Sequence, residues 1–401
     1  MRGATLSASD GEGSRLLASS VIPGEQPVLW SGVFSVDGGE SNTELLVFDI
    51  SPDVRGQTDS DPDFYTSEQN LGGTAKTLKP KAVLFRQNNM TSVLAVRHKA
   101  WMVFFIGTAD GQLIKLAVDR NYRTACPTVL YRVDDDRKVF PRIHLDQVDQ
   151  KHVYVPFRNQ VERVAVAKCS TYKDVQECWS AQDPHCVWCV PQKSCTFADD
   201  CKDSDWLSIP DEWQQQMVSH RVEKDSSGQI TLSIQTHVIV GQNPSNFACY
   251  FSATSIELCS RNSPPPQFPQ CTCILSSGVL PADGLLVIVK MRLGETHLSE
   301  QLEVTNCSGI SGPPSSVLCQ QCIKAGCGWS KSGCSWANEG EGNDSVCQKM
   351  DFGKNFSRPE ISSITPSVVS FHGRNHATLS GRNLREVSGV RIQGDLDCTP
   401  Q

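Results

Sequence analysis

The chain has no long hydrophobic run and no cluster of basic residues. Its longest apolar stretches, AWMVFFIG and GLLVIVKM, are strand-sized and far shorter than the roughly 20 apolar residues of a membrane-spanning helix. The formal net charge is −7 and the pI is near 5.7, and no stripe of Lys and Arg that could neutralise phosphates is present. We therefore expect neither a nucleic-acid partner nor a membrane span within these residues.

The sequence also lacks the motifs of common enzymes. It contains no Gly-x-Ser-x-Gly elbow, no His-Glu-x-x-His pair, no Walker loop and no dinucleotide-binding glycine pattern. The acidic run Asp134, Asp135 and Asp136 has neither the spaced ligands nor the turn glycine of a calcium loop, and we interpret it as a solvated face. The sequence thus predicts no catalytic residue, no cofactor and no metal site.

Cysteine is almost absent from the first 168 residues and abundant afterwards. Of the 18 cysteines, only Cys126 precedes Cys169. Such clustering is typical of small modules held by disulfides, which persist in an oxidising compartment. Asn-x-Ser/Thr glycosylation sites agree with secretion and are found at Asn89, Asn306, Asn343 and Asn355.

The first twenty residues, MRGATLSASDGEGSRLLASS, have no apolar core of the length that a signal peptide needs. The cysteine pattern predicts an extracellular protein, whereas the signal for export is missing. We therefore expect the chain to be an internal piece of a longer secreted or membrane-bound protein, attached to the membrane only through C-terminal sequence that is absent.

The cysteine-poor part, residues 1–168, has the pattern of paired β-strands. Three hairpins are predicted: one across residues 28–50 with a Gly-Gly turn, one at Asp110-Gly111 in WMVFFIGTADGQLIKLAV, and one at Arg158-Asn159 in HVYVPFRNQVERVAV. The last two turns lie about 48 residues apart, a spacing that suits four-stranded propeller blades. Three blades do not close a propeller, so we expect further blades from sequence outside this chain.

Two CxxC units, Cys186–Cys189 and Cys319–Cys322, admit three interpretations. A zinc knuckle would pair two such units within one loop or add a histidine at short spacing, and a thioredoxin-type redox pair would follow a strand in a βαβ unit. Neither context is visible, so structural disulfides are favoured. Between the two units, residues 222–305 alternate in strand-like fashion and suit a small β-sandwich.

Residues 169–201, CSTYKDVQECWSAQDPHCVWCVPQKSCTFADDC, resemble a PSI module, the small cysteine knot of plexins, semaphorins and integrins. Its Asp-Pro-x-Cys-x-Trp-Cys core carries the resemblance. Upstream, FIGTADGQLIKLAVD and HVYVPFRNQVERVAVAKC are similar to the last blades of a sema propeller. The order of an Ig-like IPT domain, a second PSI module and a second IPT domain is that of plexin ectodomains.

The resemblance implies a mainly β fold with five parts. These are the last ~3 blades of a sema β-propeller (1–168), a disulfide-rich PSI module (169–206), an IPT/TIG-like β-sandwich (207–306), a second PSI module (307–358) and the start of a second IPT/TIG domain (359–401).

The disulfide pairing is likewise implied by the resemblance. Laid onto the PSI order, the first module pairs Cys169–Cys186, Cys178–Cys195 and Cys189–Cys201, and the second pairs Cys307–Cys327, Cys319–Cys347 and Cys322–Cys334. Val175 and Ser330 replace one cysteine of the fourth bridge in each module, and its partner is absent too. We expect the sandwich cysteines to pair among themselves: Cys249, Cys259, Cys271 and Cys273.

Two cysteines remain without an obvious mate, namely Cys126 and Cys398. We expect their partners to lie in missing sequence; for Cys126 the alternative is a buried free thiol. Trp188 and Trp329 are interpreted as packing plugs of the small knots, with ligand contact as the alternative. His185 is interpreted as an exposed turn residue, not a catalytic base.

In function, the resemblance implies the extracellular part of a plexin-like cell-surface receptor for semaphorins, with possible co-receptors, in signalling of the axon-guidance or cell-migration type. The PSI and IPT modules would form a stiff stalk that orients the sema domain. The alternatives are a secreted semaphorin-like ligand, a decoy, or a fragment of a receptor tyrosine kinase ectodomain. The second PSI module favours the plexin-like receptor, because semaphorins and the receptor tyrosine kinases with sema domains have a single PSI module.

Overall fold

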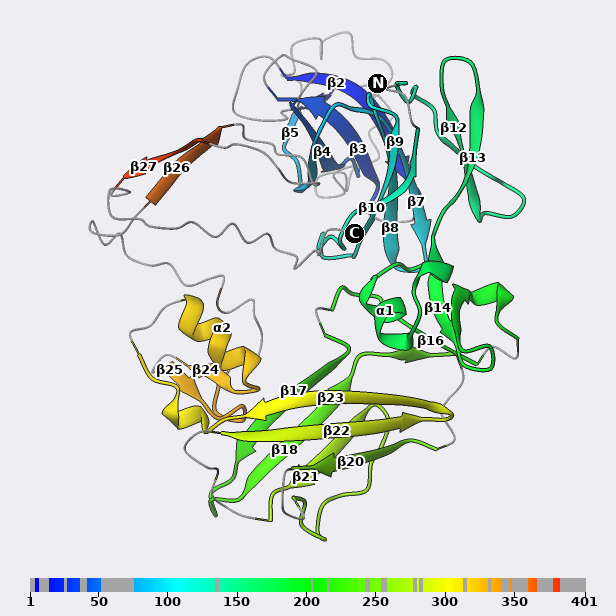
Figure 1. The fold of residues 1–401 in the computed structure, drawn as a ribbon. Helices are drawn as coiled ribbons and strands as arrows, with labels where there is room; N and C mark the ends of the chain where they lie inside the picture. The colour runs from blue at the N-terminus through cyan, green and yellow to red at the C-terminus, as the bar shows by residue number, and fades with distance from the viewer. Residues whose placement is uncertain are drawn as a thin grey trace, which may run out of the picture.

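A computed structural model provides the structure of the chain (Figure 1). It describes residues 4–6, 14–24, 27–36, 42–51, 76–133, 137–202, 205–214, 216–241, 246–253, 258–276, 280, 284–312, 316–330, 333–340, 347, 360–365 and 378–382. The acidic run Asp134 to Asp136, which we interpret as a solvated face, and most of the polar stretch 51–80 lie outside these residues.

The first part consists of three antiparallel sheets, which we call the N-terminal sheets. Their strand orders are β2-β3-β4-β6, β10-β9-β8-β7 and β11-β12-β13. The strands are β2 (Arg15–Ile22), β3 (Leu29–Ser35), β4 (Asn42–Asp49), β6 (Ala82–Asn88), β7 (Met90–His98), β8 (Trp101–Thr108), β9 (Gln112–Val118), β10 (Thr128–Arg132), β11 (His144–Leu145), β12 (His152–Pro156) and β13 (Val161–Ala165). A short parallel pair, β1 (Ala4–Leu6) with β5 (Lys76–Leu78), accompanies them.

The three predicted hairpins are confirmed as β3 with β4, β8 with β9 and β12 with β13. The middle sheet is covered on both faces. One face of it, with Phe104 and Ile106, packs on the first sheet, and the other, with Val103 and Phe105, packs on the third sheet and the following module. Burial on both sides explains why β8 is an unbroken apolar run instead of an alternating strand.

The first cysteine-rich module, residues 169–208, contains little regular structure. It has η3 (Cys169–Thr171), α1 (Val175–Ser180), β14 (Cys186–Cys189), β15 (Ser194–Phe197), η4 (Ala198–Asp200) and β16 (Trp206–Ser208). Asp174 caps α1 by accepting a hydrogen bond from the backbone of Glu177 at 2.8 Å. Strand β16 pairs with β14 on one side and with β19 (Ile239–Val240) on the other, so it connects the module to the next domain.

The sandwich, residues 218–304, is two three-stranded sheets with orders β17-β18-β21 and β20-β22-β23. Its strands are β17 (Val218–Lys224), β18 (Ile230–Thr236), β20 (Ala248–Ser252), β21 (Gln270–Ile274), β22 (Leu285–Leu293) and β23 (Thr296–Val304). In β22 the inward side chains Val287, Val289 and Met291 are buried, whereas Leu286 and Ile288 between them are exposed. This period of two is what a half-buried sheet requires.

The second cysteine-rich module, residues 307–347, has η6 (Cys307–Gly309), α2 (Ser316–Lys324), β24 (Gly328–Ser330) and β25 (Gly333–Ser335). The hairpin of β26 (Glu360–Thr365) and β27 (Thr378–Arg382) follows. Figure 1 shows the N-terminal sheets, the first module and the sandwich in series, with the second module beside the sandwich. One contiguous cluster of buried residues runs through all four, from Phe105 through Trp179 and Val289 to Cys322.

Candidate functional site: the two module joints

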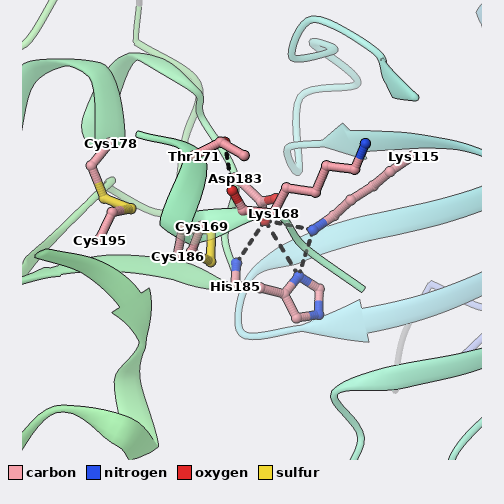
Figure 2. The surroundings of a disulfide bond; sticks show 9 residues. All are labelled: Lys115, Lys168, Cys169, Thr171, Cys178, Asp183, His185, Cys186 and Cys195. Carbon is pink, nitrogen blue, oxygen red and sulfur yellow. Dashed lines mark hydrogen bonds and ion pairs between the residues drawn. A yellow bond between two sulfur atoms is a disulfide. The ribbon is translucent and has the colours of Figure 1, made fainter. Parts of the chain in front are cut away.

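The first joint is the contact between the middle N-terminal sheet and the first cysteine-rich module. At its centre Lys115 projects from β9, a strand in which every residue is buried. Its Nζ donates to Oδ1 of Asp183 at 2.6 Å and lies 3.0 Å from Nδ1 of His185 (Figure 2). The ring of His185 stacks on that of His98, at the end of β7, with 4.1 Å between centroids. A cation and an imidazole from the sheets thus meet a carboxylate and an imidazole from the module.

The local sequence holds this arrangement in place. In the turn between α1 and β14, Asp183 accepts the backbone N–H of His185 at 2.9 Å through its Oδ1, and its carbonyl accepts the N–H of Cys186 at 3.0 Å. Cys186 is disulfide-bonded to Cys169, which begins the module. The bridge therefore fixes the residue that directly follows His185.

Burial and charge shift the titration of this cluster strongly. Burial alone would raise the pKa of Asp183, but the Lys115 ammonium and the hydrogen bond with His185 hold that pKa well below its usual range. Burial, followed by the nearby Lys115 ammonium, lowers the pKa of His185 to about 3. Burial also lowers the pKa of Lys115, against which the charge and the hydrogen bond of Asp183 act. At neutral pH the cluster is therefore a Lys115–Asp183 ion pair beside a neutral His185.

Further contacts surround this centre. On the module itself, Lys151 pairs with Asp200 at 2.7 Å, and Lys99 lies 5.0 Å above the ring of Trp206. The segment that directly follows the module also contacts the middle sheet: the indole N–H of Trp101 donates to the carbonyl of Pro210 at 3.0 Å, and the backbone N–H of Trp213 donates to Asp119 at 3.0 Å. Arg120 pairs with Glu212 of the same segment. The polar contacts thus extend from the buried centre to the solvent-exposed edge of the interface.

The second joint is the contact of the second cysteine-rich module with β17 of the sandwich. The backbone N–H of Val222 donates to Gly326 at 2.8 Å, and the N–H of Ala337 donates to Val222 at 3.0 Å. The guanidinium of Arg221 donates to the carbonyl of Ala337 at 2.9 Å. The module therefore docks by main-chain hydrogen bonds, as an added strand would.

Gly326 allows this close approach. Its φ of +76° is in the left-handed region, and a Cβ there would lie 2.5 Å from Cδ2 and 2.9 Å from the carbonyl oxygen of His220. His220 is itself largely buried, and this burial lowers its pKa. Any side chain at position 326 would separate the module from β17.

The structure joins the same six cysteine pairs that the resemblance implies: Cys169–Cys186, Cys178–Cys195, Cys189–Cys201, Cys307–Cys327, Cys319–Cys347 and Cys322–Cys334. In the sandwich the pairs are Cys249–Cys271 and Cys259–Cys273. Cys249 and Cys271 stand on strands of opposite sheets, so their bridge ties the two layers together. Trp329 is buried and Trp188 half-buried, both against the core, as packing plugs would be.

Two sequence interpretations are wrong. His185 is only 7% exposed and is not a solvated turn residue, because the module presses its turn against β9. Cys126 is disulfide-bonded, so it is neither a free thiol nor without a mate in this chain. Cys398 lies outside the described residues.

Sequence reasoning also missed Lys115, Asp183 and His98. A signal for Lys115 exists in QLIKLAV, because a lysine within a continuous apolar strand requires a buried partner. Nothing in the sequence identifies that partner as Asp183, 68 positions away.

Two of the four glycosylation sites fall on described residues. Asn306 is exposed, and its side chain accepts the N–H of Ser308 at 3.2 Å. Asn89 forms a tight turn with φ of +60°, and the hydroxyl of Thr91, the third residue of its motif, donates to the carbonyl of Val139 at 2.7 Å. Asn343 and Asn355 lie outside the described residues.

Within the described ranges no group of His, Cys, Asp and Glu is placed to hold a metal ion. No described helix combines the length and the apolar character that crossing a membrane would need. The crevice beside Trp179 and Trp188 in the first module has no room for a water molecule.

Small disulfide-bonded modules docked in series onto β-sheets define a multidomain β-protein of the extracellular type. A family model described as PSI, plexin repeat, matches residues 168–220. Human Plexin-C1 is 29% identical over 437 aligned residues, which cover 96% of this chain and 26% of the relative. Human Plexin-A2 is 27% identical over 361 residues, covering 83% of this chain and 18% of the relative. The chain is thus similar to plexins over nearly its whole length, and it spans about a quarter of the length of Plexin-C1.

Among solved structures, the full extracellular region of Plexin A4 matches with a TM-score of 0.41 at 19% identity, covering 88% of this chain and 41% of that chain.

Replacing Lys115 tests the first joint. Lys115→Met should lower the free energy of unfolding by about 3–5 kcal/mol, because it leaves the Asp183 carboxylate buried without a cation. Adding Asp183→Asn should recover at least half of this loss, because the amide oxygen still accepts the His185 N–H. Urea unfolding measures both, with the exposed Lys138→Met as control, expected to change stability by less than about 0.5 kcal/mol. A single variant as stable as Lys138→Met would disprove the buried ion pair.

Replacing Gly326 tests the second joint. Gly326→Ala should detach the second module from β17, because the methyl group meets the fixed backbone of His220. Limited proteolysis should then cut β17 or the module at least tenfold faster. Gly294→Ala is the matched control, since Gly294 has a φ of +59° and an added Cβ would meet nothing within 4 Å; it carries the backbone strain without the clash. Equal cleavage of the two variants would contradict the docking.

Proposed function

We propose that the chain is the stalk-bearing part of the extracellular region of a plexin-type receptor for semaphorins at the cell surface. Similarity to Plexin-C1 over 96% of the chain supports the receptor class. The observation that carries the stalk role is the buried core that continues from the N-terminal sheets to the second module. Such continuity, with a polar joint at each docking, transmits the orientation of one module to the next.

Both joints are held by several polar contacts, as a stiff stalk requires, although the kind of contact differs between them. The first depends on side chains, with a buried ion pair of 2.6 Å at its centre. The second depends on main-chain hydrogen bonds of 2.8 and 3.0 Å. Neither is a flexible tether, and relative motion at either joint would break several polar contacts at once.

The proposal includes the parts on which the stalk depends. These are the domain limits 1–168, 169–206, 207–306, 307–358 and 359–401, the six module bridges with the two sandwich bridges, and N-linked glycans at Asn89, Asn306, Asn343 and Asn355. We assign binding and orientation to the chain, and no catalysis.

The test uses cells that display these residues within the full-length protein. A panel of soluble semaphorins should yield at least one that binds saturably and triggers a change in cell shape. With Gly326→Ala, the affinity should stay within twofold while the response falls several-fold, since the second joint lies far along the stalk from the N-terminal sheets. Gly294→Ala should keep both.

The outcomes separate the two halves of the proposal. If no semaphorin binds, the receptor assignment is wrong. If Gly326→Ala cells respond like Gly294→Ala cells, the rigid-stalk role is wrong although the receptor assignment stands. A chain that binds semaphorin but produces no response in any form would favour the decoy alternative.

A further inference from the structure

The first joint contains two histidines that come from different parts of the fold. His98 ends β7 of the N-terminal sheets, and His185 lies in the turn before β14 of the first module. Their rings stack with 4.1 Å between centroids and 21° between planes. His185 is 7% exposed. The stack therefore exists only while the module is docked.

The positive charges around the stacked rings of His98 and His185 make protonation of either ring unfavourable while the module is docked. Nδ1 of His185 faces the Lys115 ammonium at 3.0 Å. Among the described residues the carboxylate next to the stack is Asp183, which lies 3.5 Å from the same Nδ1 and is already paired with Lys115 at 2.6 Å. On the other side, Lys99 adds positive charge next to His98. Tyr172, whose pKa is raised by burial and by Asp183, is the remaining titratable group facing this carboxylate. A protonated His185 would therefore lie against a second cation inside the protein.

Titration follows this geometry in both rings. Burial, and then the Lys115 ammonium, lowers the pKa of His185 to about 3. Burial, with Lys99 and Lys115, also lowers the pKa of His98. Because the docked pKa is below the ordinary value of 6.5, docking is favoured fully above pH 6.5 and progressively less as the pH falls from 6.5 toward 3.

We propose that the first joint is an acid-sensitive latch, closed at the neutral pH of extracellular fluid and opening more often at about pH 5–6, as in acidic compartments, because His185 and His98 take up protons in the open form. Opening exposes the rings to water, where each takes up a proton. The Lys115–Asp183 ion pair, 2.6 Å long, holds the joint closed at neutral pH. This inference does not depend on which ligand the protein binds.

Hydrogen–deuterium exchange on the full chain tests the latch. Labelling at pH 7.4 and 5.5, with times corrected for the intrinsic exchange rate, gives protection factors for peptides across residues 98–104 and 183–189. Uptake of one proton by His185 on opening predicts an about tenfold loss of protection at the lower pH. Peptides from β22 and β23 should change less than twofold. Equal changes in the joint and in these strands would overturn the proposal.

Variants separate titration from a purely structural role. His185→Gln keeps an acceptor for Lys115 but cannot be protonated, so most of the pH dependence of the protection factors should vanish. The double variant His185→Gln/His98→Phe should lose the remaining pH dependence. His297→Gln, on the exposed face of β23, should retain the tenfold change. If His185→Gln is less protected than wild type by the same factor at both pH values, its tenfold difference between pH 7.4 and pH 5.5 remains. That result would show that the latch is wrong. Should this variant not fold, the wild-type measurement decides alone.

Discussion

The disulfide bridges of the two cysteine-rich modules are the constraint on which the other contacts depend. In the described residues of each module there is one short α-helix and a few strands of three or four residues, too little to bury an independent core. Loops of 12 to 28 residues closed by each bridge remove conformational freedom from the unfolded chain, worth about 3 kcal/mol each in the chain-entropy view. The bridges replace the missing core.

The joints depend on these bridges. The Cys169–Cys186 bond holds the turn that presents Asp183 and His185 to β9. In the second module, the segment from Cys322 to Cys327 turns at Gly326 to meet β17, and its two end residues are bonded to Cys334 and Cys307. A module without its bridges would have no fixed face to dock. The buried ion pair then fixes the orientation of the first module on the middle sheet. Lys115 and Asp183 compensate each other's desolvation only when the two side chains meet.

Much of the fold could be predicted from sequence because its signals are local. Hairpin turns such as Asp110-Gly111 and the alternation in β22 depend on neighbouring residues, and the cysteine order follows from a resemblance. The joints could not be predicted, because Lys115 and Asp183 meet only after two separate domains have folded. His185 was misinterpreted for the same reason: its turn looks exposed until the sheet that covers it is in place.

Non-reducing peptide mapping of the purified native chain tests most directly whether the disulfide bridges hold the modules. We expect linked peptides for the six module pairs, including Cys169 with Cys186 and Cys319 with Cys347. A peptide linking Cys169 to Cys178, or a Cys319 that reacts with an alkylating reagent before reduction, would contradict it.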